Sequence, residues 1–306
     1  MPTALLFPGQ GAQNVGMGAT LVARSSEARR LFETASEILG YDLLKLCSDG
    51  PLEQLSRTEF GQPALFVHSY AAMRQLEIEQ PTVWESVSSV AGLSLGEYTA
   101  VAVAGGFSFE SGVRLVHARG QAMQEASDLI PSGMSSVIGL ELEQLEEVCR
   151  AATSESATGE FVQVANLLCP GNTAISGHLA ALEIAERLSV EAGAMKAIRL
   201  QVAGAFHTAI MQPAVAKLKA ALAEVEFSPT RVPVVSNVDA APHTDPDQIR
   251  PLLPQQVIEP VRWEQSLRTM IDSGVDRFIE VGTGRVLAGT LKRIQRKLPC
   301  ENYGDS

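Results

Sequence analysis

Paired cysteines, metal-binding clusters and long apolar runs are all missing from this 306-residue chain. Its four cysteines lie far apart, with no CxxC pair or Cys/His ligand spacing, so no zinc, redox or other metal site is predicted. Isolated cysteines are typical of reduced thiols, so a cytoplasmic location is expected. No window approaches about 18 apolar residues, and Pro8 and Gly9 interrupt the only early apolar run. Neither a membrane span nor a signal peptide is therefore predicted.

Positive charge is also scarce. The chain has 24 Lys and Arg residues against 35 Asp and Glu, a formal net charge of -11. General nucleic-acid binders need the opposite sign, so that class is excluded, and only a local basic patch for an acidic partner remains open. A content of 45% hydrophobic and 19% charged residues is that of a globular protein, not of a disordered, collagen-like or coiled-coil chain.

Two short apolar segments, each followed by a glycine-containing turn, indicate an α/β fold. Residues Ala4–Phe7 are predicted to form a buried strand that leads into the loop Pro8–Gly11. Residues Ser86–Ala91 are predicted to form a second strand, which leads through Gly92–Gly96 into a small-residue helix at Glu97–Gly105. Similar patterns predict helices at Leu21–Leu39, Pro63–Leu76, Glu110–Ala126 and after Pro213, and strands at Val232–Ser236 and Arg277–Val281.

The middle of the chain has a different order of elements. Its predicted strands and helices run β-α-β-β-α-β, which is the order of a ferredoxin-like unit. They are Ser135–Leu140, Leu142–Thr153, Phe161–Leu168, Asn172–Ser176, Leu179–Ala192 and Lys196–Leu200. The predicted architecture is a hydrolase-like α/β subdomain with a parallel sheet at 1–130 and 201–306, and an inserted ferredoxin-like small subdomain at 131–200.

The segment Gly92–Gly96 matches G-x-S-x-G, the pattern of a nucleophile elbow. Its glycines allow a turn sharp enough to present the hydroxyl of Ser94 at the tip of the sheet, with the N–H of Leu95 aimed at the same reacting carbonyl oxygen. The plainer interpretation is a tight strand–helix turn with small residues for packing, in which Glu97 only favours the helix N-terminus.

A nucleophilic serine needs a base, and position favours His207 among the five histidines. It ends Leu200–His207, which is predicted as a strand followed by a tight turn just before a helix. The other histidines lie in predicted helices, at a helix start or in a polar loop. Asp128 is the only aspartate between Ser94 and His207, and it lies in a polar stretch, so a group other than a carboxylate is expected to orient the imidazole.

One arginine lies in the apolar stripe of its predicted helix. Arg119 is flanked at helical spacing by Val116, Ala122 and Met123, whereas Arg114 lies outside the stripe. A guanidinium is costly to bury without partners, so a structural salt bridge or a snorkelling side chain is one interpretation. The other is a receptor for a carboxylate on the substrate, since arginine binds carboxylates through two parallel hydrogen bonds.

Taken together, these residues resemble the malonyl-CoA:acyl carrier protein transacylases along almost the whole chain. The serine elbow, the Arg119 helix and the histidine segment each match a motif of that family. The full set of matching segments is Phe7–Gln13, Gly92–Glu97, Arg119 with Met123, Asn166–Gly177, Gly204–His207, Ser236–Val238, Gln256–Trp263 and Glu280–Leu287.

The resemblance implies a catalytic Ser94–His207 pair. Ser94 would carry the acyl group, and His207 would serve as general base and acid. The N–H groups of Gln10 and Leu95 would form the oxyanion hole, and Gln256 would accept the imidazole N–H in place of an aspartate. Its neighbour Gln255 leaves this register open by one residue, with Gln256 preferred from the spacing to Pro260 and Trp263.

The resemblance also implies how the acyl group is held. Arg119 would bind the free carboxylate of malonyl, with Met123 on the same helix and Asn166 shaping the cleft. Phe206 would select against a methyl branch on the acyl group, because a phenyl ring near the base leaves little room. Leu93 departs from the commoner histidine before the serine, so no polar role is expected for that side chain.

The implied reaction is a ping-pong transfer. Malonyl would pass from malonyl-CoA through a malonyl-serine ester to the phosphopantetheine thiol of an acidic acyl carrier protein, with no cofactor. The product would feed fatty-acid or polyketide synthesis. Alternatives are a serine esterase or thioesterase, a discrete polyketide-synthase acyltransferase and a non-catalytic carrier-binding subunit. Candidate carrier-docking cations are Lys196, Arg199, Lys292, Arg293, Arg296 and Lys297, although the last four also fit a solvated helix face.

Overall fold

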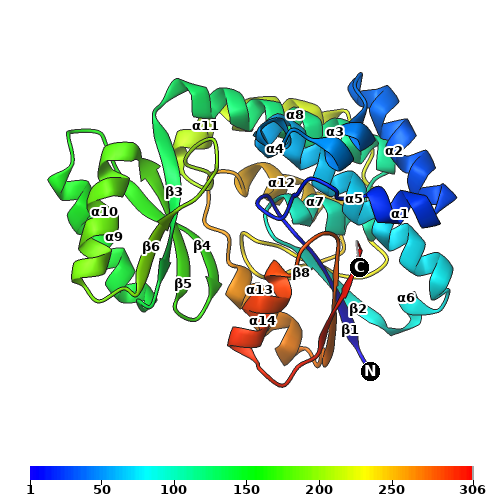
Figure 1. The fold of residues 1–306 in the computed structure, drawn as a ribbon. Coiled ribbons are helices and arrows are strands. Elements are labelled where there is room, and N and C mark those ends of the chain that lie inside the picture. The colour runs from blue at the N-terminus through cyan, green and yellow to red at the C-terminus, as the bar shows by residue number, and fades with distance from the viewer. Residues whose placement is uncertain (305–306) are drawn as a thin grey trace.

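Two separate β-sheets organise the chain in the computed structural model, which describes residues 1–304 (Figure 1). The larger sheet has the strand order β10-β9-β1-β2-β7-β8, and every neighbouring pair is parallel except β7–β8 at one edge. Its strands are β1 Thr3–Phe7, β2 Val87–Gly92, β7 Val234–Val235, β8 Pro242–His243, β9 Arg277–Val281 and β10 Cys300–Tyr303.

Helices cover both faces of the larger sheet, because its central strand is apolar on both sides. In β1, Leu5 and Phe7 join the core beneath most of the helices, whereas Ala4 and Leu6 join a second core against α13 and α14. The helices of this half are α1 Ala19–Arg24, α2 Ser26–Leu39, α3 Leu43–Asp49, α4 Leu52–Ser56, α5 Thr58–Glu79, α6 Val83–Ser86, α7 Leu95–Val103, α8 Phe109–Leu129, α11 Gln212–Ala223, α12 Pro246–Gln255, α13 Trp263–Asp272 and α14 Val286–Ile294, with a 3₁₀ turn at Ala209–Met211.

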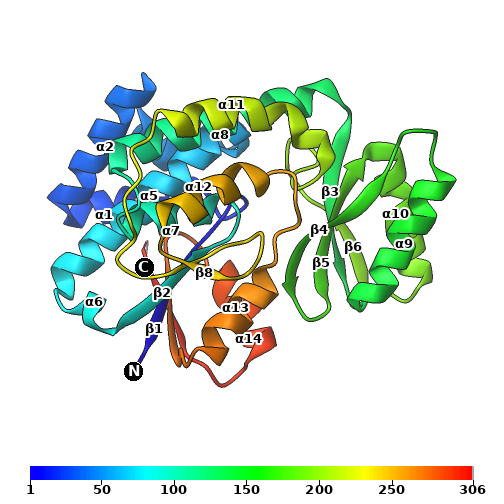
Figure 2. The ribbon, with the colours of Figure 1, turned by 180° about the vertical axis from the view of Figure 1, so that it is seen from behind.

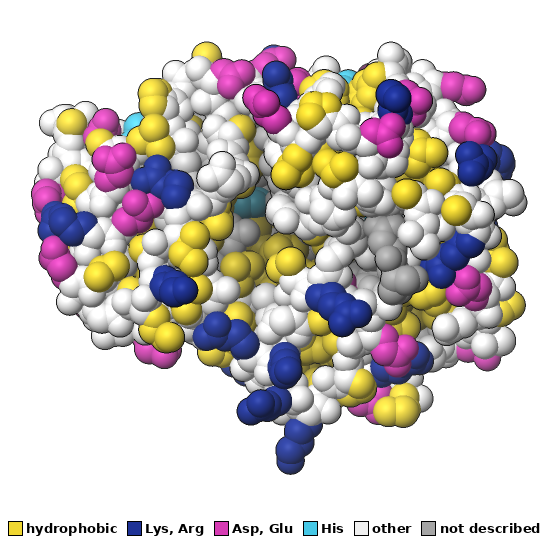
Figure 3. All heavy atoms as spheres, in the orientation of Figure 1, with side chains coloured by type: hydrophobic (Ala, Val, Ile, Leu, Met, Phe, Trp, Pro, Cys, Tyr) yellow, Lys and Arg dark blue, Asp and Glu magenta, His cyan; other side chains and the backbone are white. Residues whose placement is uncertain are grey.

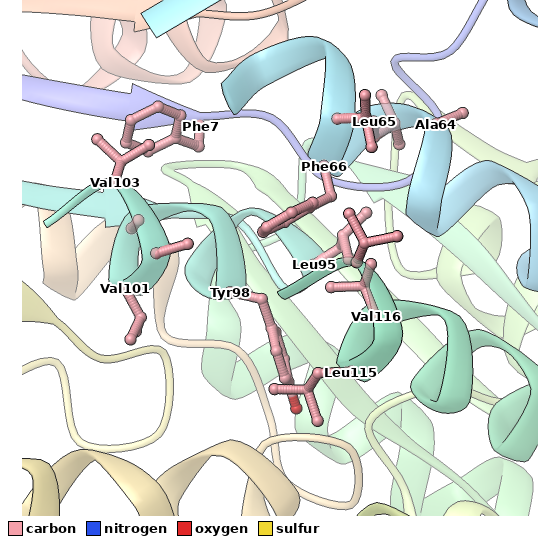
Figure 4. Packing of buried hydrophobic residues seen from close by; sticks show 14 of the residues in the cluster. Phe7, Ala64, Leu65, Phe66, Leu95, Tyr98, Val101, Val103, Leu115 and Val116 are labelled. Carbon is pink, nitrogen blue, oxygen red and sulfur yellow. The ribbon is translucent and has the colours of Figure 1, made fainter. Parts of the chain in front are cut away.

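The larger core surrounds the helix that follows the predicted nucleophile. Tyr98 of α7 is fully buried and donates its hydroxyl hydrogen to the carbonyl of Leu253, 3.0 Å away. Figure 4 labels the packed side chains around α7, which come from β1, α5, α7 and α8: Phe7, Ala64, Leu65, Phe66, Leu95, Tyr98, Val101, Val103, Leu115 and Val116. This packing makes α7 and the turn before it a rigid platform.

The smaller sheet is antiparallel and has the strand order β4-β5-β3-β6. Its elements are β3 Ser132–Ile138, α9 Leu142–Glu155, β4 Val162–Cys169, β5 Asn172–His178, α10 Leu179–Glu191 and β6 Lys196–Arg199. Helices α9 and α10 cover one face, and Figures 1 and 2 show this unit beside the larger sheet, connected through α8 and the loop before α11. The predicted fold class, a parallel α/β unit with an inserted ferredoxin-like unit, is confirmed. The exact division at residues 131 and 200 stays a prediction.

Backbone hydrogen bonds join the two units beside the site. The N–H of Leu167 in β4 donates to the carbonyl of Val261, 2.9 Å away, and the N–H of Val261 donates to the carbonyl of Ala165, 2.8 Å away. Because Val261 closely follows Gln256, these bonds fix the small sheet against the segment expected to orient His207.

Two local predictions are wrong. The helix expected at Leu21–Leu39 is two helices, because Ser25 is extended and its hydroxyl caps α2 through the N–H of Ala28. The stretch Leu200–His207 contains no strand, and His207 has a positive φ of 62° that a strand does not allow. Among residues 1–304, the structure contains no helix that is both long and apolar enough to cross a membrane.

Candidate active site

Ser94 lies in a sharp turn between β2 and α7. Its φ of 50° and ψ of -103° form a strained backbone conformation. Glycine is required on both sides of the turn, since a Cβ at Gly92 would lie 1.9 Å from the backbone of Gly96, and one at Gly96 would lie 2.1 Å from the carbonyl oxygen of Phe7. The turn has the close backbone packing expected of a nucleophile elbow.

His207 reaches this serine from the loop before α11. Its Nε2 lies 2.9 Å from Ser94 Oγ, and its Nδ1 lies 2.7 Å from the backbone carbonyl oxygen of Gln256. A carbonyl oxygen only accepts, so the neutral ring carries its hydrogen on Nδ1 and turns the Nε2 lone pair toward the serine hydroxyl. Burial, reinforced by the charge of Arg119, lowers the pKa of His207 to about 4, against the opposing hydrogen bond to Gln256. The imidazole is therefore neutral and able to accept a proton at pH 7.

The N–H groups of Gln10, in the loop after β1, and of Leu95, at the start of α7, lie at the same edge of the sheet. Parallel pairing of β1 with β2 aligns Phe7 with Gly92, which brings the loop after β1 beside the serine turn. The approach is so close that a Cβ at Gly9 would lie 2.3 Å from the carbonyl oxygen of Leu93. Neither N–H donates to another backbone oxygen within residues 1–304, as expected for donors to a substrate oxyanion.

Arg119 projects from α8 into the same site and is only 1% exposed. Its Nη2 donates to Ser94 Oγ at 3.1 Å and to the side-chain oxygen Oε1 of Gln256 at 2.9 Å. The guanidinium lies over the ring of Tyr98, 5.0 Å from its centroid. In the part of the chain that the structure describes, no acidic side chain forms a salt bridge with Arg119, and its Nε has no hydrogen-bond partner. The structural ion pair considered from the sequence is absent there.

A cavity of about 230 Å³ lies in front of these groups, between the two subdomains. Figure 3 shows the hollow between the two lobes of the molecule. Its walls are mostly apolar and come from both units: Pro8, Gly9, Gln10, Gly11, Ala12, Leu93, Ser94, Leu95, Arg119, Met123, Met134, Asn166, Leu168, Ala174, Leu200, Val202, Phe206, His207, Val286 and Leu287. One buried cation in an apolar pocket beside a nucleophile suits an acyl group that ends in a carboxylate.

Apart from Gln256, which lies behind His207, the site residues singled out from the sequence all line this one cavity. Met123 and Phe206 contribute apolar walls, and Asn166 lines the cavity from the small sheet with its side-chain oxygen unbonded within residues 1–304. Gln256 contacts His207 through its backbone, whereas the side chain of Gln255 bonds to Glu259 Oε1, 2.7 Å away. No group of three His, Cys, Asp or Glu residues in this part of the chain could hold a metal ion.

Two residues support the site in ways that the sequence did not indicate. Asn237 accepts the N–H of Ser94 on Oδ1 at 2.7 Å and donates its Nδ2 hydrogen to the carbonyl of Gly92 at 2.8 Å, which holds the elbow from behind. Glu97, expected only to favour the helix N-terminus, is 2% exposed and bonds to Asn237 and Gln256. Burial raises the pKa of Glu97 to about 7, although these hydrogen bonds lower it. Their only sequence signal is their place in the segments Gly92–Glu97 and Ser236–Val238.

Comparison with known proteins agrees with this geometry. The acyl transferase domain family matches residues 4–302. The malonyl CoA-acyl carrier protein transacylase of Bacillus subtilis is 41% identical over 96% of this chain and 91% of its own length. The mitochondrial human enzyme of the same name is 41% identical over 95% of this chain and 76% of its own length.

A solved structure extends the comparison to three dimensions. It contains the malonyl-transacylase PlMCAT in complex with AntF, a type II PKS acyl-carrier protein in its holo form. The match has a TM-score of 0.93 at 38% identity and covers 100% of this chain and 97% of the other. The elbow serine, its histidine and the buried arginine thus lie in a chain that belongs to the acyl transferase family, among the malonyl-CoA–acyl carrier protein transacylases.

Proposed function

We propose that this chain moves a malonyl group from malonyl-CoA to the phosphopantetheine thiol of an acyl carrier protein through a malonyl ester of Ser94. The observation that carries the assignment is the meeting of three groups in one cavity. Ser94 Oγ lies 2.9 Å from the base His207 and 3.1 Å from the buried cation Arg119. A nucleophile and base alone fit any acyl transfer, whereas the cation fits an acyl group with a free carboxylate.

The first half-reaction acylates the serine. As Ser94 Oγ bonds to the thioester carbon, its proton moves to Nε2 of His207, and the carbonyl oxygen becomes an oxyanion held by the N–H groups of Gln10 and Leu95. The carbon–sulfur bond then breaks, and the imidazolium returns its proton to the departing CoA sulfur. The backbone carbonyl of Gln256 keeps the ring oriented and favours its charged form.

The second half-reaction runs the same steps with a different thiol. The pantetheine thiol of the carrier protein gives its proton to His207 and attacks the ester carbon. Collapse breaks the bond to Ser94 Oγ, which recovers its proton from the imidazolium. The product is a malonyl thioester on the carrier, the extender unit for fatty-acid or polyketide synthesis.

Arg119 selects the acyl group in this proposal. In the free site Arg119 donates only to the uncharged oxygens of Ser94 and Gln256, and malonyl brings a carboxylate to this buried cation. An acetyl group supplies no such partner, so the buried cation stays without a counter-ion. Met123, Asn166 and Phe206 complete the wall around the acyl chain.

The carrier docks, in this proposal, on the C-terminal basic patch, defined as Arg285, Lys292, Arg293, Arg296 and Lys297. All five side chains are exposed, and no acidic residue occurs between Glu280 and Glu301. Dark blue Lys and Arg side chains gather below the cleft, over α14, in Figure 3. Only Lys292 and Arg293 lie within α14, so the patch is more than one helix face. Arg199 is a weaker candidate, since it bonds to both carboxylate oxygens of Glu186, at 2.7 and 3.0 Å.

Ionic strength and charge reversal test this docking surface. Transfer to carrier protein should slow as salt rises, and Lys292→Glu with Arg293→Glu should slow it roughly tenfold. Acylation by malonyl-CoA should stay within about twofold, and Lys219→Glu, a single charge reversal at an exposed position on α11, serves as a control. Equal loss in both half-reactions, or salt-independent transfer, would contradict docking on this patch.

The chain is further proposed to work in the reducing environment of the cytoplasm. Its four cysteines are all free thiols, and three of them are buried. Alkylation of the denatured protein, taken from cells without a reductant, should label all four. A disulfide found in that sample would contradict this location.

The reaction class is tested by following labelled malonyl. Label from malonyl-CoA should appear on carrier protein when the holo carrier is present, and free malonate should form slowly. Rapid release of free malonate, at a rate that holo carrier does not change, would instead make the chain an esterase or thioesterase.

A further inference from the structure

A buried carboxyl group lies behind the site, out of contact with the cavity. Glu97 belongs to the first turn of α7 and is 2% exposed, with no access to the cavity that holds the acyl group. Its Oε2 accepts two hydrogen bonds, one from the backbone N–H of Asn237 at 3.3 Å and one from Nε2 of Gln256. A buried titratable group with this set of partners needs an explanation beyond helix capping.

Both partners of Glu97 also hold the nucleophile. Asn237 Oδ1 accepts the N–H of Ser94 at 2.7 Å, and Gln256 Nε2 donates to the carbonyl oxygen of Ser94 at 3.0 Å. The strained backbone of the serine is therefore fixed on both sides of its Cα by residues that Glu97 itself fixes.

The direction of the Gln256 amide depends on Glu97. A carboxylate oxygen accepts hydrogen bonds, so it draws the NH₂ end of the amide, which leaves the oxygen end facing Nη2 of Arg119 at 2.9 Å. The reversed amide would place its NH₂ group against the guanidinium, donor against donor. Glu97, together with the carbonyl of Ser94, therefore favours the orientation in which Gln256 holds Arg119 in place.

We propose that Glu97 is a positioning residue, which orients the Gln256 amide and through it fixes Arg119 where the acyl carboxylate binds. The neutral amide also separates the two charges, so that Glu97 does not form an ion pair with Arg119 and the cation stays free for the substrate. This inference rests on the proposed role of Arg119 and adds the group that makes the cation selective.

Selectivity between two substrates separates positioning from simple structural support. The experiment measures kcat/KM for malonyl-CoA and for acetyl-CoA on wild type, Glu97→Leu and Glu97→Gln. The control is Glu77→Gln on α5, a mostly buried glutamate that pairs with Arg74 and Trp84 away from the cavity. Glu97→Leu should lower the malonyl-to-acetyl ratio about tenfold or more, since the Gln256 amide then keeps only the carbonyl of Ser94 as an acceptor and holds Arg119 less firmly. Glu97→Gln keeps an acceptor oxygen and should lower the ratio several-fold, whereas Glu77→Gln should leave it unchanged.

An unchanged ratio in folded Glu97→Leu overturns the inference, even if overall activity falls. If that variant does not fold, Glu97→Gln decides alone, and a ratio equal to wild type overturns the proposal. Failure of the proposed function is distinct, because wild type would then form no malonyl adduct on Ser94.

Discussion

A backbone oxygen of Gln256 lies 2.7 Å from His207 Nδ1, in the place where many serine hydrolases have a carboxylate. The imidazole of His207 is therefore oriented by the backbone of Gln256 and not by a side chain. The side chain of Gln256 is left free to bind Arg119. One residue thus serves the base with its backbone and the acyl-binding cation with its side chain.

Because Gln256 orients the base through its backbone alone, substitutions at His207 and at Gln256 should have different effects. His207→Ala removes the base and should slow both half-reactions by roughly 10²–10⁴-fold. Gln256→Ala keeps the carbonyl and should retain serine acylation within about tenfold, while the preference for malonyl over acetyl falls. Pre-steady-state acylation by each acyl-CoA measures both quantities. Equal losses of acylation in the two variants would mean that the Gln256 side chain, not its backbone, supports the base.

The buried titratable pair predicts how stability depends on pH. His207 has a folded pKa of about 4, below its unfolded value, so its contribution makes the fold less stable as pH falls from about 6.5 toward 4. Glu97 has a folded pKa of about 7, above its unfolded value, so its contribution makes the fold less stable as pH rises from about 4.5 toward 7.

Replacement of the carboxylate isolates its share of this dependence. Relative to wild type, Glu97→Gln should gain free energy of unfolding between pH 5 and pH 7, by at most about 1.4 kcal/mol per pH unit. Urea unfolding at the two pH values measures the difference. A stability difference from wild type that is the same at pH 5 and pH 7 would show that Glu97 titrates normally in the folded chain.

Arg119 predicts selectivity for a carboxylate. Arg119→Ala should lower kcat/KM for malonyl-CoA by roughly 10²–10³-fold and raise the relative activity with acetyl-CoA, because the buried charge and its partner are lost together. Arg114→Ala on the exposed face of the same helix is the control. If Arg119→Ala keeps the malonyl-to-acetyl ratio, the guanidinium has only a structural role.

Phe206 predicts a second, smaller selectivity. Its ring is 5% exposed and lines the cavity next to His207, so a methyl branch at the α-carbon of the acyl group would meet it. Such a contact costs about 1–3 kcal/mol, and Phe206→Ser should improve use of methylmalonyl-CoA relative to malonyl-CoA by about tenfold or more. The malonyl-to-acetyl ratio should not move. If Phe206→Ser uses methylmalonyl-CoA relative to malonyl-CoA no better than wild type does, the methyl branch does not contact Phe206.

Much of the site could be predicted because its signals are local. The apolar run of β1, the glycines around Ser94 and the apolar stripe around Arg119 each lie within one segment, and the structure places all three as their patterns indicate. Parallel pairing then brings strand ends together without further information from the sequence.

The features that the sequence did not predict correctly depend mostly on contacts with other parts of the chain. The apolar residues Leu200 and Val202 line the cavity, so their apolar character reflects the acyl site and not burial in a sheet. Buried Glu97 accepts a hydrogen bond from the side chain of Gln256, 159 positions away, and nothing near Glu97 in the sequence indicates that partner. Ser25 interrupts a continuous helical pattern by capping α2. Apolar periodicity alone does not distinguish one long helix from two.

Mapping the acyl adduct tests the central claim most directly. The protein is mixed briefly with malonyl-CoA, quenched in acid, digested and analysed by mass spectrometry, with Ser94→Ala treated in parallel. The account predicts a malonyl group on the peptide that contains Ser94, its loss when holo carrier protein is added before the quench, and no adduct on Ser94→Ala. A malonyl adduct that persists on Ser94→Ala at another residue, or a wild-type adduct that carrier protein does not remove, would contradict it.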